Sequence, residues 1–248
     1  MKKLSGLLLT FFLSFATAAH ADLYTTNFGT QLSGPSNCDD CFAGPIAFSG
    51  SNQSINFFNN SYSSLYVGSN GYVTFGAGRS DFGAAPLNTQ TVGPMIAGFF
   101  TDLDSRNDAR SNIYVNTSNI GEIIATWVEM GHYSRNYSQR STFQLLIRSD
   151  QASVPVGEGR IGFFYGSMTD TNIGSAGFGD GLIGSNPGEE AFASQVSGTT
   201  LSNNNPRYYG INNGVPTSTQ ENIPEPDSWM LLAVGLVGFI AARKKKTT

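Results

Sequence analysis

Residues 64–75 read SLYVGSNGYVTF, which is the clearest secondary-structure signal in the chain. Two runs of apolar, β-branched and aromatic residues stand on either side of Ser69-Asn70-Gly71. An Asn-Gly pair supplies the positive φ angles of a tight hairpin turn, and the flanking runs have the composition of strands. The segment therefore predicts an antiparallel β-hairpin.

Further short runs of the same kind follow, each bounded by Asn, Gly, Ser or Asp. Their spacing favours an all-β fold, a single antiparallel sandwich- or barrel-like domain, over alternating strands and helices. We place this domain at residues 22–215. The runs are Ile113–Val115, Glu122–Val128, Thr142–Ile147 and Arg160–Tyr165.

The composition agrees with a folded β domain. The 248 residues include 29 Gly and 10 Pro, and only 13% are charged, which disfavours long surface helices. A disordered chain is excluded because 40% of the residues are hydrophobic, including 18 Phe and 10 Tyr, and can fill a core. Residues 22–224 hold 8 Arg, no Lys and 16 acidic residues, so their formal charge is 8 − 16 = −8. Such a domain repels phosphate backbones, so we expect no nucleic-acid partner.

The N-terminus has the pattern of an export signal. Lys2 and Lys3 precede an apolar stretch from Leu4 to Phe15, and Ala19-His20-Ala21 offers a small-x-small cleavage site. We therefore expect a signal peptide at residues 1–21, removed after Ala21. The alternative is an uncleaved N-terminal anchor, for which the apolar stretch is short.

The C-terminus carries a second membrane segment. Residues 228–242 (SWMLLAVGLVGFIAA) are uncharged and apolar, and Arg243, Lys244, Lys245 and Lys246 follow at once. Because basic residues stay cytoplasmic, the preceding domain must lie outside the inner membrane. A span of 15 residues is short for a hydrocarbon core of ~30 Å, which suits a temporary stop better than a permanent anchor.

Pro224-Glu225-Pro226 stands just before that segment. The order of Pro-Glu-Pro, hydrophobic helix and basic end over residues 223–248 closely resembles the PEP-CTERM sorting tail of Gram-negative bacteria, although Lys stands at three of the four basic positions. The resemblance implies recognition by an exosortase-type membrane protease, a transient inner-membrane anchor, and a final place at the cell surface or outside the cell. Two prolines keep the junction extended and accessible to a protease. Residues 216–222 are expected to be a linker. A plain C-terminal anchor is the alternative.

Five further motifs follow one another along the chain, namely Val67–Phe75, Pro94–Asp104, Trp127, Thr142–Leu145 and Ala176–Gly181. Their order and separation resemble a nidogen-like (NIDO) domain over roughly residues 55–215. The family is extracellular and occurs in adhesion and matrix proteins, so the resemblance implies an interaction module and supplies no catalytic residues. The companion modules of those proteins are absent from this sequence.

Catalytic motifs are scarce. His132 is the only histidine outside the signal peptide, and neither HExxH nor Gly-x-Ser-x-Gly after a strand occurs. We interpret His132 as an ordinary loop or strand residue. Carboxylates are the only potentially catalytic side chains that are numerous in this sequence. A glycosidase needs two of them about 5 to 10 Å apart. A carboxylate glycosidase therefore stays open.

Asp102, Asp104 and Asp108 form the densest acidic cluster. Asp102 and Asp104 occupy alternate positions of an extended segment and so point to one face, and Asp108 follows a turn, so the three could bind calcium through oxygen ligands. The pattern is not an EF-hand, because Ile113 stands where a bidentate Glu is needed. The alternative is structural, with the carboxylates capping turns and neutralised by Arg106 or Arg110.

Cys38 and Cys41 are the only cysteines. In an oxidising compartment, two cysteines three residues apart most simply form a local disulfide. The intervening Asp39 and Asp40 would raise a thiol pKa, which disfavours a redox role, and zinc would need two more ligands.

Together these features predict a noncatalytic, exported adhesion or matrix protein of the cell surface or biofilm, with no cofactor apart from the calcium considered above. Its expected partners are the exosortase-type protease and an exopolysaccharide or surface protein. The alternative function is a carboxylate-dependent glycosidase or a calcium-dependent glycan-binding protein acting on extracellular polysaccharide.

Overall fold

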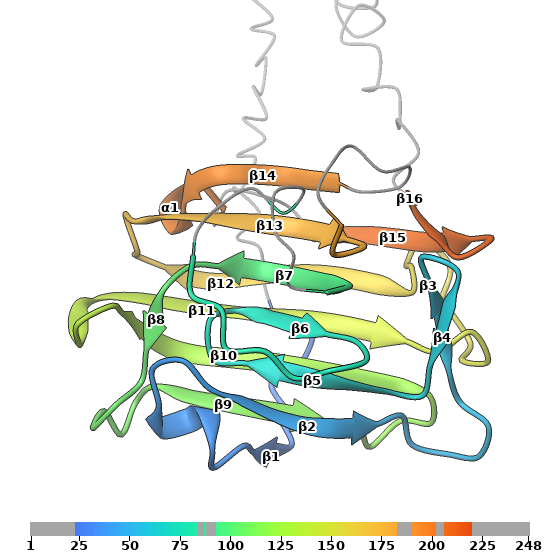
Figure 1. Cartoon of the computed structure of the whole chain (residues 1–248), viewed down its shortest axis with the longest axis horizontal. Coiled ribbons are helices and arrows are strands. Elements are labelled where there is room, and N and C mark those ends of the chain that lie inside the picture. Colours follow the sequence, from blue (N-terminus) through green and yellow to red (C-terminus); the bar gives the residue numbers. More distant parts are fainter. Residues whose placement is uncertain (1–22, 84–86, 88–92, 183–189, 202–205, 220–248) are drawn as a thin grey trace, which may run out of the picture.

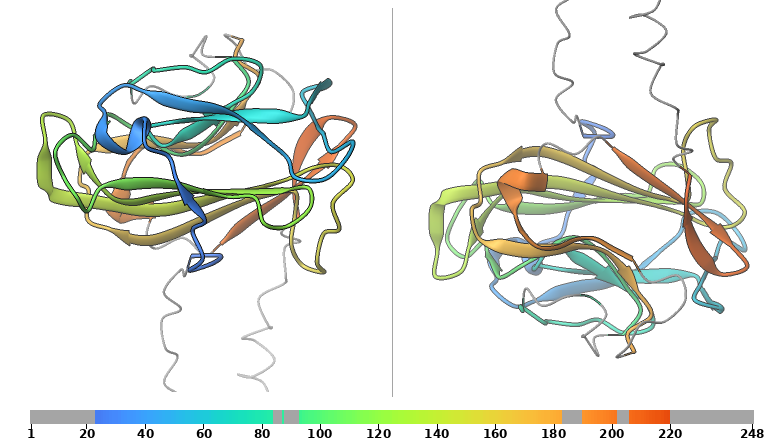
Figure 2. Two further views of the ribbon diagram at one scale, coloured as in Figure 1. Left: turned by 90° about the horizontal axis from the view of Figure 1, so that it is seen from below. Right: turned by 90° about the horizontal axis from the view of Figure 1, so that it is seen from above.

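The computed structural model describes residues 23–219 except for 84–86, 88–92, 183–189 and 202–205. Two antiparallel sheets pack face to face in this part of the chain (Figures 1 and 2). The fold is thus all-β, as predicted, and of the two predicted forms it is the sandwich. The expected signal peptide and the expected membrane helix at 228–242 lie outside the described residues. Within the described ranges, no helix has the length and hydrophobicity needed to span a membrane.

The larger sheet has eight strands in the order β1-β9-β10-β11-β12-β15-β16, with β8 paired to β10. The strands predicted at 113–115, 122–128, 142–147 and 160–165 are β9, β10, β11 and β12, and β10 and β11 run well beyond their predicted ends. The bounds are β1 Thr30–Gln31, β8 Leu103–Asp104, β9 Asn112–Asn116, β10 Glu122–His132, β11 Asn136–Arg148, β12 Ile161–Met168, β15 Arg207–Asn212 and β16 Val215–Ser218.

The smaller sheet has the order β14-β13-β7-β6-β5-β2, and β3 and β4 form a separate hairpin. Two short helices, the 3-10 helix η1 and α1, complete the described elements. Their bounds are η1 Pro35–Asn37, β2 Phe42–Ala47, β3 Ile55–Phe57, β4 Asn60–Tyr62, β5 Ser64–Gly68, β6 Tyr72–Thr74, β7 Met95–Phe100, β13 Ile173–Gly179, β14 Glu190–Ser197 and α1 Gly198–Leu201.

The predicted hairpin at 64–75 is confirmed as β5 and β6. Gly68 pairs with Tyr72, which leaves a loop of Ser69, Asn70 and Gly71. Gly71 has a φ of 84°, and a Cβ at this position would clash with the carbonyl oxygen of Phe99 in the adjacent strand β7. Only glycine satisfies both the turn and this close approach.

Alternating side chains of β10 build the core between the sheets. Ile123, Ala125 and Trp127 are fully buried in the main cluster, which draws on both sheets. The Trp127 ring stacks on Phe143 at 5.0 Å, and its Nε1 donates a hydrogen bond of 3.0 Å to the carbonyl oxygen of Gly68 in the opposite sheet. An indole that bridges the sheets satisfies its buried donor and fixes how the layers align.

The two ends of the described domain meet on the outer face of the larger sheet. Near the start, the Tyr24 ring packs on Phe164 at 5.1 Å, and Thr25 exchanges two hydrogen bonds with the Gln144 amide. Near the end, the Tyr208 ring packs on the same Phe164 at 5.5 Å. Phe164 therefore lies between the first and last segments of the fold.

The linker expected from residue 216 begins later than predicted, because Val215–Ser218 form strand β16. Asn212 pairs with Val215, and the intervening Asn213 and Gly214 both have positive φ, which is the geometry of a two-residue hairpin turn. This Asn-Gly turn lies inside the predicted domain, but the predicted boundary at residue 215 leaves out the second strand of the hairpin. Thr219 continues the ordered chain by donating two hydrogen bonds to the carbonyl oxygen of Tyr208.

Candidate functional site

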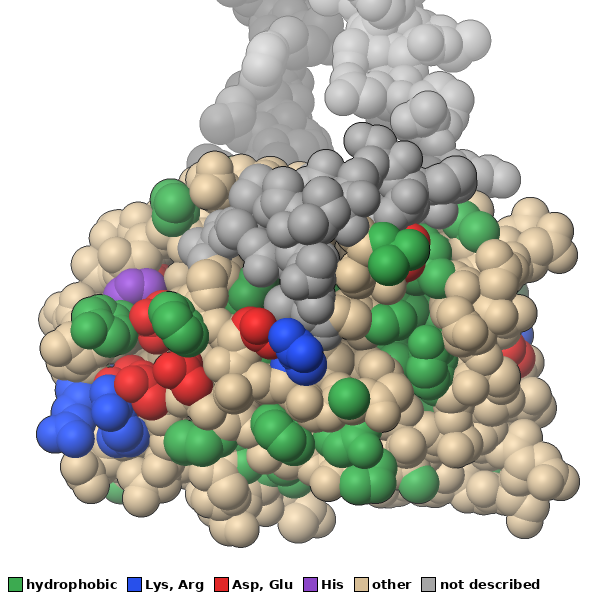
Figure 3. Space-filling model, viewed as in Figure 1, with side chains coloured by type: hydrophobic (Ala, Val, Ile, Leu, Met, Phe, Trp, Pro, Cys, Tyr) green, Lys and Arg blue, Asp and Glu red, His purple; other side chains and the backbone are tan. Residues whose placement is uncertain are grey.

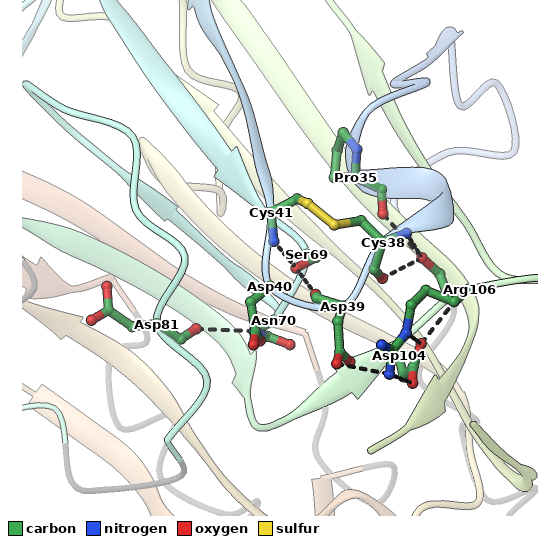
Figure 4. Close-up of a disulfide and its surroundings, with 11 residues drawn as sticks. Pro35, Cys38, Asp39, Asp40, Cys41, Ser69, Asn70, Asp81, Asp104 and Arg106 are labelled. Atoms are coloured by element: carbon green, nitrogen blue, oxygen red, sulfur yellow. Dashed lines mark hydrogen bonds and ion pairs between the residues drawn. A yellow bond between two sulfur atoms is a disulfide. The ribbon is translucent and has the colours of Figure 1, made fainter. Parts of the chain in front are cut away.

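The loop from Cys38 to Cys41 lies between η1 and β2 and carries Asp39 and Asp40 (Figure 4). The expected disulfide is formed, with Cα atoms 6.0 Å apart. The Ser69 hydroxyl accepts a hydrogen bond of 3.0 Å from the Cys41 backbone and donates one to the carbonyl oxygen of Asp39. The disulfide loop is thus attached to the turn between β5 and β6.

Asn70 extends this attachment to the strand that follows β7. Its side-chain nitrogen donates to the Asp40 carboxylate at 2.8 Å and to the carbonyl oxygen of Asp81 at 3.0 Å. Its side-chain oxygen accepts from the Leu103 backbone at 2.8 Å, and the residue is fully buried. The sequence indicated Asn70 only as a turn residue, whereas the structure uses its amide to join three segments.

Three carboxylates meet at this junction, and we call Asp39, Asp40 and Asp102 the acidic group. One oxygen from each lies within 4.8 Å of the others. The Oδ1 atoms of Asp39 and Asp102 are both buried and have no hydrogen-bond partner among the described residues. Burial and the charges of Asp40 and Asp39 raise the Asp102 pKa to about 6. Oxygen ligands so arranged could hold a hard divalent cation. Figure 3 shows acidic side chains gathered on one flank of the smaller sheet's face, beside basic ones.

Asp104 and Asp108, the other two predicted calcium ligands, are held by arginines. The Asp104 side chain is fully buried and accepts hydrogen bonds from the Arg106 guanidinium at 2.9 and 2.5 Å. Asp108 accepts from Arg140 at 2.6 Å and from the Ser111 hydroxyl at 2.7 Å. Burial opposes ionisation of both carboxyls, but these bonds outweigh it and lower both pKa values.

The structure therefore does not bring the predicted trio together as one ligand set. Asp102 instead lies beside Asp39 and Asp40 of the disulfide loop. The sequence did not indicate a ligand role for these two residues. The alternative of neutralisation by Arg106 holds for Asp104, and Arg106 also pairs with Oδ2 of Asp39 at 2.8 Å, which leaves only Oδ1 of Asp39 without a partner. Arg110 instead pairs its guanidinium with Glu129 at 2.5 Å.

His132 lies at the end of β10 and is largely buried. Its Nδ1 is 3.4 Å from Oδ2 of Asp170, whose side chain is fully buried. Burial opposes ionisation of Asp170, but the neighbouring His132 ring and the hydrogen bonds from Asn172 lower its pKa. The histidine thus lies in a strand, as interpreted from the sequence, and faces a carboxylate of the loop after β12.

A pocket of about 390 Å³ lies at the opposite end of β10, and we call it the Arg148 pocket. Its floor is an ion-paired arginine, and its walls come from the turn before β10 and the loop after β11. The lining includes Tyr24, Ile120, Glu122, Arg148, Gln151 and Ser153.

Two protein-family models match this chain. The model of the family described as NIDO related matches residues 14–221, which is most of the chain. The chain belongs to the NIDO-related family. The β sandwich is accordingly a NIDO-related domain, and the resemblance seen in its sequence motifs is confirmed. Comparison with curated proteins and with solved structures gave no match.

A PEP-CTERM protein-sorting motif matches residues 222–246, directly after the NIDO-related domain. The sorting tail predicted at 223–248 is thereby confirmed as a family motif. It implies export and membrane-anchored sorting in a Gram-negative bacterium, with recognition by an exosortase. Pro224, Glu225, Pro226 and the basic residues 243–246 belong to this match and lie outside the described residues.

Proposed function

We propose that this protein is a noncatalytic interaction module that acts at the cell surface or in the extracellular polysaccharide matrix after an exosortase-type protease has removed its tail. The observation that carries this proposal is that a NIDO-related domain at 14–221 is followed without a gap by a sorting motif at 222–246. The acidic domain, with eight Arg and no Lys between residues 22 and 224, suits exposure to solvent and polysaccharide.

The Arg148 pocket supports a noncatalytic role over a glycosidase. A glycosidase needs an acid of raised pKa and a second carboxylate on either side of a bound sugar. Asp102, with its raised pKa, lies by the His132 end of β10, because Leu103 pairs with His132. The Arg148 pocket lies by Glu122, about 30 Å away along the strand. Glu122 itself is already bound by Arg148 and Asn119.

Processing of the sorting tail tests the proposal. We expect protein isolated from the extracellular fraction to end near Pro226 and to lack the apolar segment, as measured by intact mass. Replacing Pro224, Glu225 and Pro226 together by alanine should leave the tail in place and the protein in the membrane fraction. Glu221→Gln lies outside the matched motif and should process normally. Wild-type extracellular protein that retains residues 229–248 would refute the proposal.

Calcium binding is a second candidate, favoured by the two buried carboxylate oxygens that lack a donor. We propose the acidic group, rather than the original trio, as its ligands. With a Kd of ~0.1 to 1 mM, typical of extracellular modules, ~10 mM calcium should stabilise the chelator-treated protein by about 1.4 to 2.7 kcal/mol.

Thermal melting with and without calcium measures this effect. Asp102→Asn should abolish the increment, whereas Asp108→Asn should keep it, because Arg140 already occupies the Asp108 carboxylate. A wild-type melting curve that calcium leaves unmoved would exclude this function for the acidic group.

A further inference from the structure

The Arg148 pocket is a built cavity, because hydrogen bonds fix both of its walls. The turn before β10 is held by bonds from the Gly121 backbone to Ser49 and from Ser149 to the Gly121 carbonyl oxygen. The loop after β11 is held by the Arg160 guanidinium, which donates to the carbonyl oxygens of Ser149 and Asp150. A volume of about 390 Å³ falls within the range of small-ligand sites, which is roughly 300 to 1,000 Å³.

The floor of the pocket is polar but already satisfied. Arg148 is 2% exposed and donates to Glu122 at 2.9 Å, to Glu158 at 2.6 Å, to the Tyr24 hydroxyl at 2.7 Å and to the carbonyl oxygen of Gly159 at 2.8 Å. Glu122 lines the pocket, and Glu158, which does not line it, pairs with the same guanidinium, so this group of three charges at and beneath the floor is net negative. An anionic ligand would be repelled there and would find Arg148 engaged.

The rim offers neutral hydrogen-bonding groups beside apolar surface. Within the described part of the chain, the Ser153 hydroxyl and the Gln151 side-chain nitrogen make no hydrogen bond, while the Gln151 oxygen accepts from the Ser54 backbone at 2.9 Å. That bond orients the Gln151 amide. Ile120, which is 71% exposed, and Pro155 supply apolar walls. Amide and hydroxyl groups next to aliphatic surface match the hydroxyls and C–H face of an uncharged sugar ring.

We propose that the Arg148 pocket binds a neutral saccharide unit and discriminates against uronates and other anionic sugars. Gln151 and Ser153 bind the sugar hydroxyls, and Ile120 packs against the apolar face of the ring. This inference rests on the proposed function, since it names a neutral extracellular polysaccharide as the partner of the surface module.

Titration of the mature protein, purified from its host, tests the pocket. The probes are neutral hexose and N-acetylhexosamine oligosaccharides, and oligoglucuronates of the same length serve as the anionic comparison. Binding is measured by calorimetry or by NMR chemical shifts. We expect binding of at least one neutral probe and none of the glucuronates. Combining Gln151→Ala with Ser153→Ala should weaken binding by about tenfold or more through the loss of two hydrogen bonds.

The matched control is Ser80→Ala, an exposed serine on the loop after β6, which should bind as the wild type does. A bulky Ser153→Trp change should block the pocket, and an unchanged melting temperature would show that the fold is intact. Glucuronate binding equal to that of neutral probes, no binding of any neutral probe, or wild-type affinity in both variants would overturn the inference.

Cell fractionation separates this inference from the proposed function. Suppose that Ser153→Trp protein is exported and is processed at the same C-terminal residue as the wild type. If it then binds no sugar in vitro and is less retained on the cells, both the inference and the proposed function are supported. If the wild-type protein keeps its tail inside the membrane, the proposed function fails while in vitro binding still decides the pocket. Normal processing without sugar binding overturns the pocket alone.

Discussion

The Asp108 carboxylate stabilises the folded domain because Arg140 and Ser111 donate to it where little water reaches, the Asp108 and Arg140 side chains being 12% and 13% exposed. Its pKa is lowered on folding, so the stabilisation is complete above the unfolded pKa near 4 and is lost as pH falls through the folded pKa. We expect Asp108→Asn to lower the free energy of unfolding at pH 7 by about 1.5 to 3 kcal/mol, and by much less near pH 3.

Denaturant unfolding at both pH values measures that difference. Asp81→Asn is the matched control, because the Arg79–Asp81 pair is exposed to solvent, with 41% and 30% of the side-chain surface accessible. An exposed pair contributes about 0 to 1 kcal/mol. Equal effects of the two substitutions at pH 7 would contradict the role given to Asp108.

At the scale of elements, the segment before β1 holds the outer face of the larger sheet. Tyr24 packs on Phe164 and lies 5.6 Å from the Arg148 guanidinium, to which its hydroxyl is also hydrogen-bonded. We expect Tyr24→Ala to cost about 2 to 3 kcal/mol of unfolding free energy, and Tyr24→Phe about 1 kcal/mol, since the ring stays and only the hydroxyl is lost.

The contacts of Tyr24 also depend on where the signal peptide is removed. Signal-peptide removal after Ala21 would leave Tyr24 on the mature protein, whereas trimming beyond it would remove the contact. Thermal melting of the two Tyr24 variants measures the effect, with Tyr133→Ala as a control because that side chain is 58% exposed. If the Tyr24→Ala variant has the same melting temperature as the wild type, the segment before β1 does not stabilise the sheet.

For the whole molecule, the important feature is that the first and last described segments share one face. Tyr24 and Tyr208 both pack on Phe164, and Thr219 is bonded to Tyr208. The chain therefore enters and leaves the described domain on the same side. The smaller sheet covers the other side of the sandwich (Figure 2). A domain attached to the membrane through these ends presents the smaller sheet away from them.

The amino-acid sequence by itself determined much of this protein. Strand runs at 64–75, 113–115 and 142–147 appear where their composition places them, and the tail was predicted from three adjacent features. These signals are local, because the period of two along a strand and the positive φ of an Asn-Gly turn depend on neighbouring residues. The C-terminal hairpin was missed because β16 has only four residues, one of them proline, so its strand state depends on pairing with β15 and not on a local pattern.

Only the tertiary structure decided which charged groups meet. Asp102 and Asp104 are two residues apart, yet Asp104 is bound by Arg106 while Asp102 faces Asp39 and Asp40, which the sequence placed only inside a disulfide loop. Tyr24 and Arg148 are 124 positions apart and meet at the pocket floor. Sheet order and the packing of the two layers fix such contacts. Local periodicity carries no information about which distant strand becomes a neighbour, so the composition of both candidate sites follows from the assembled sandwich.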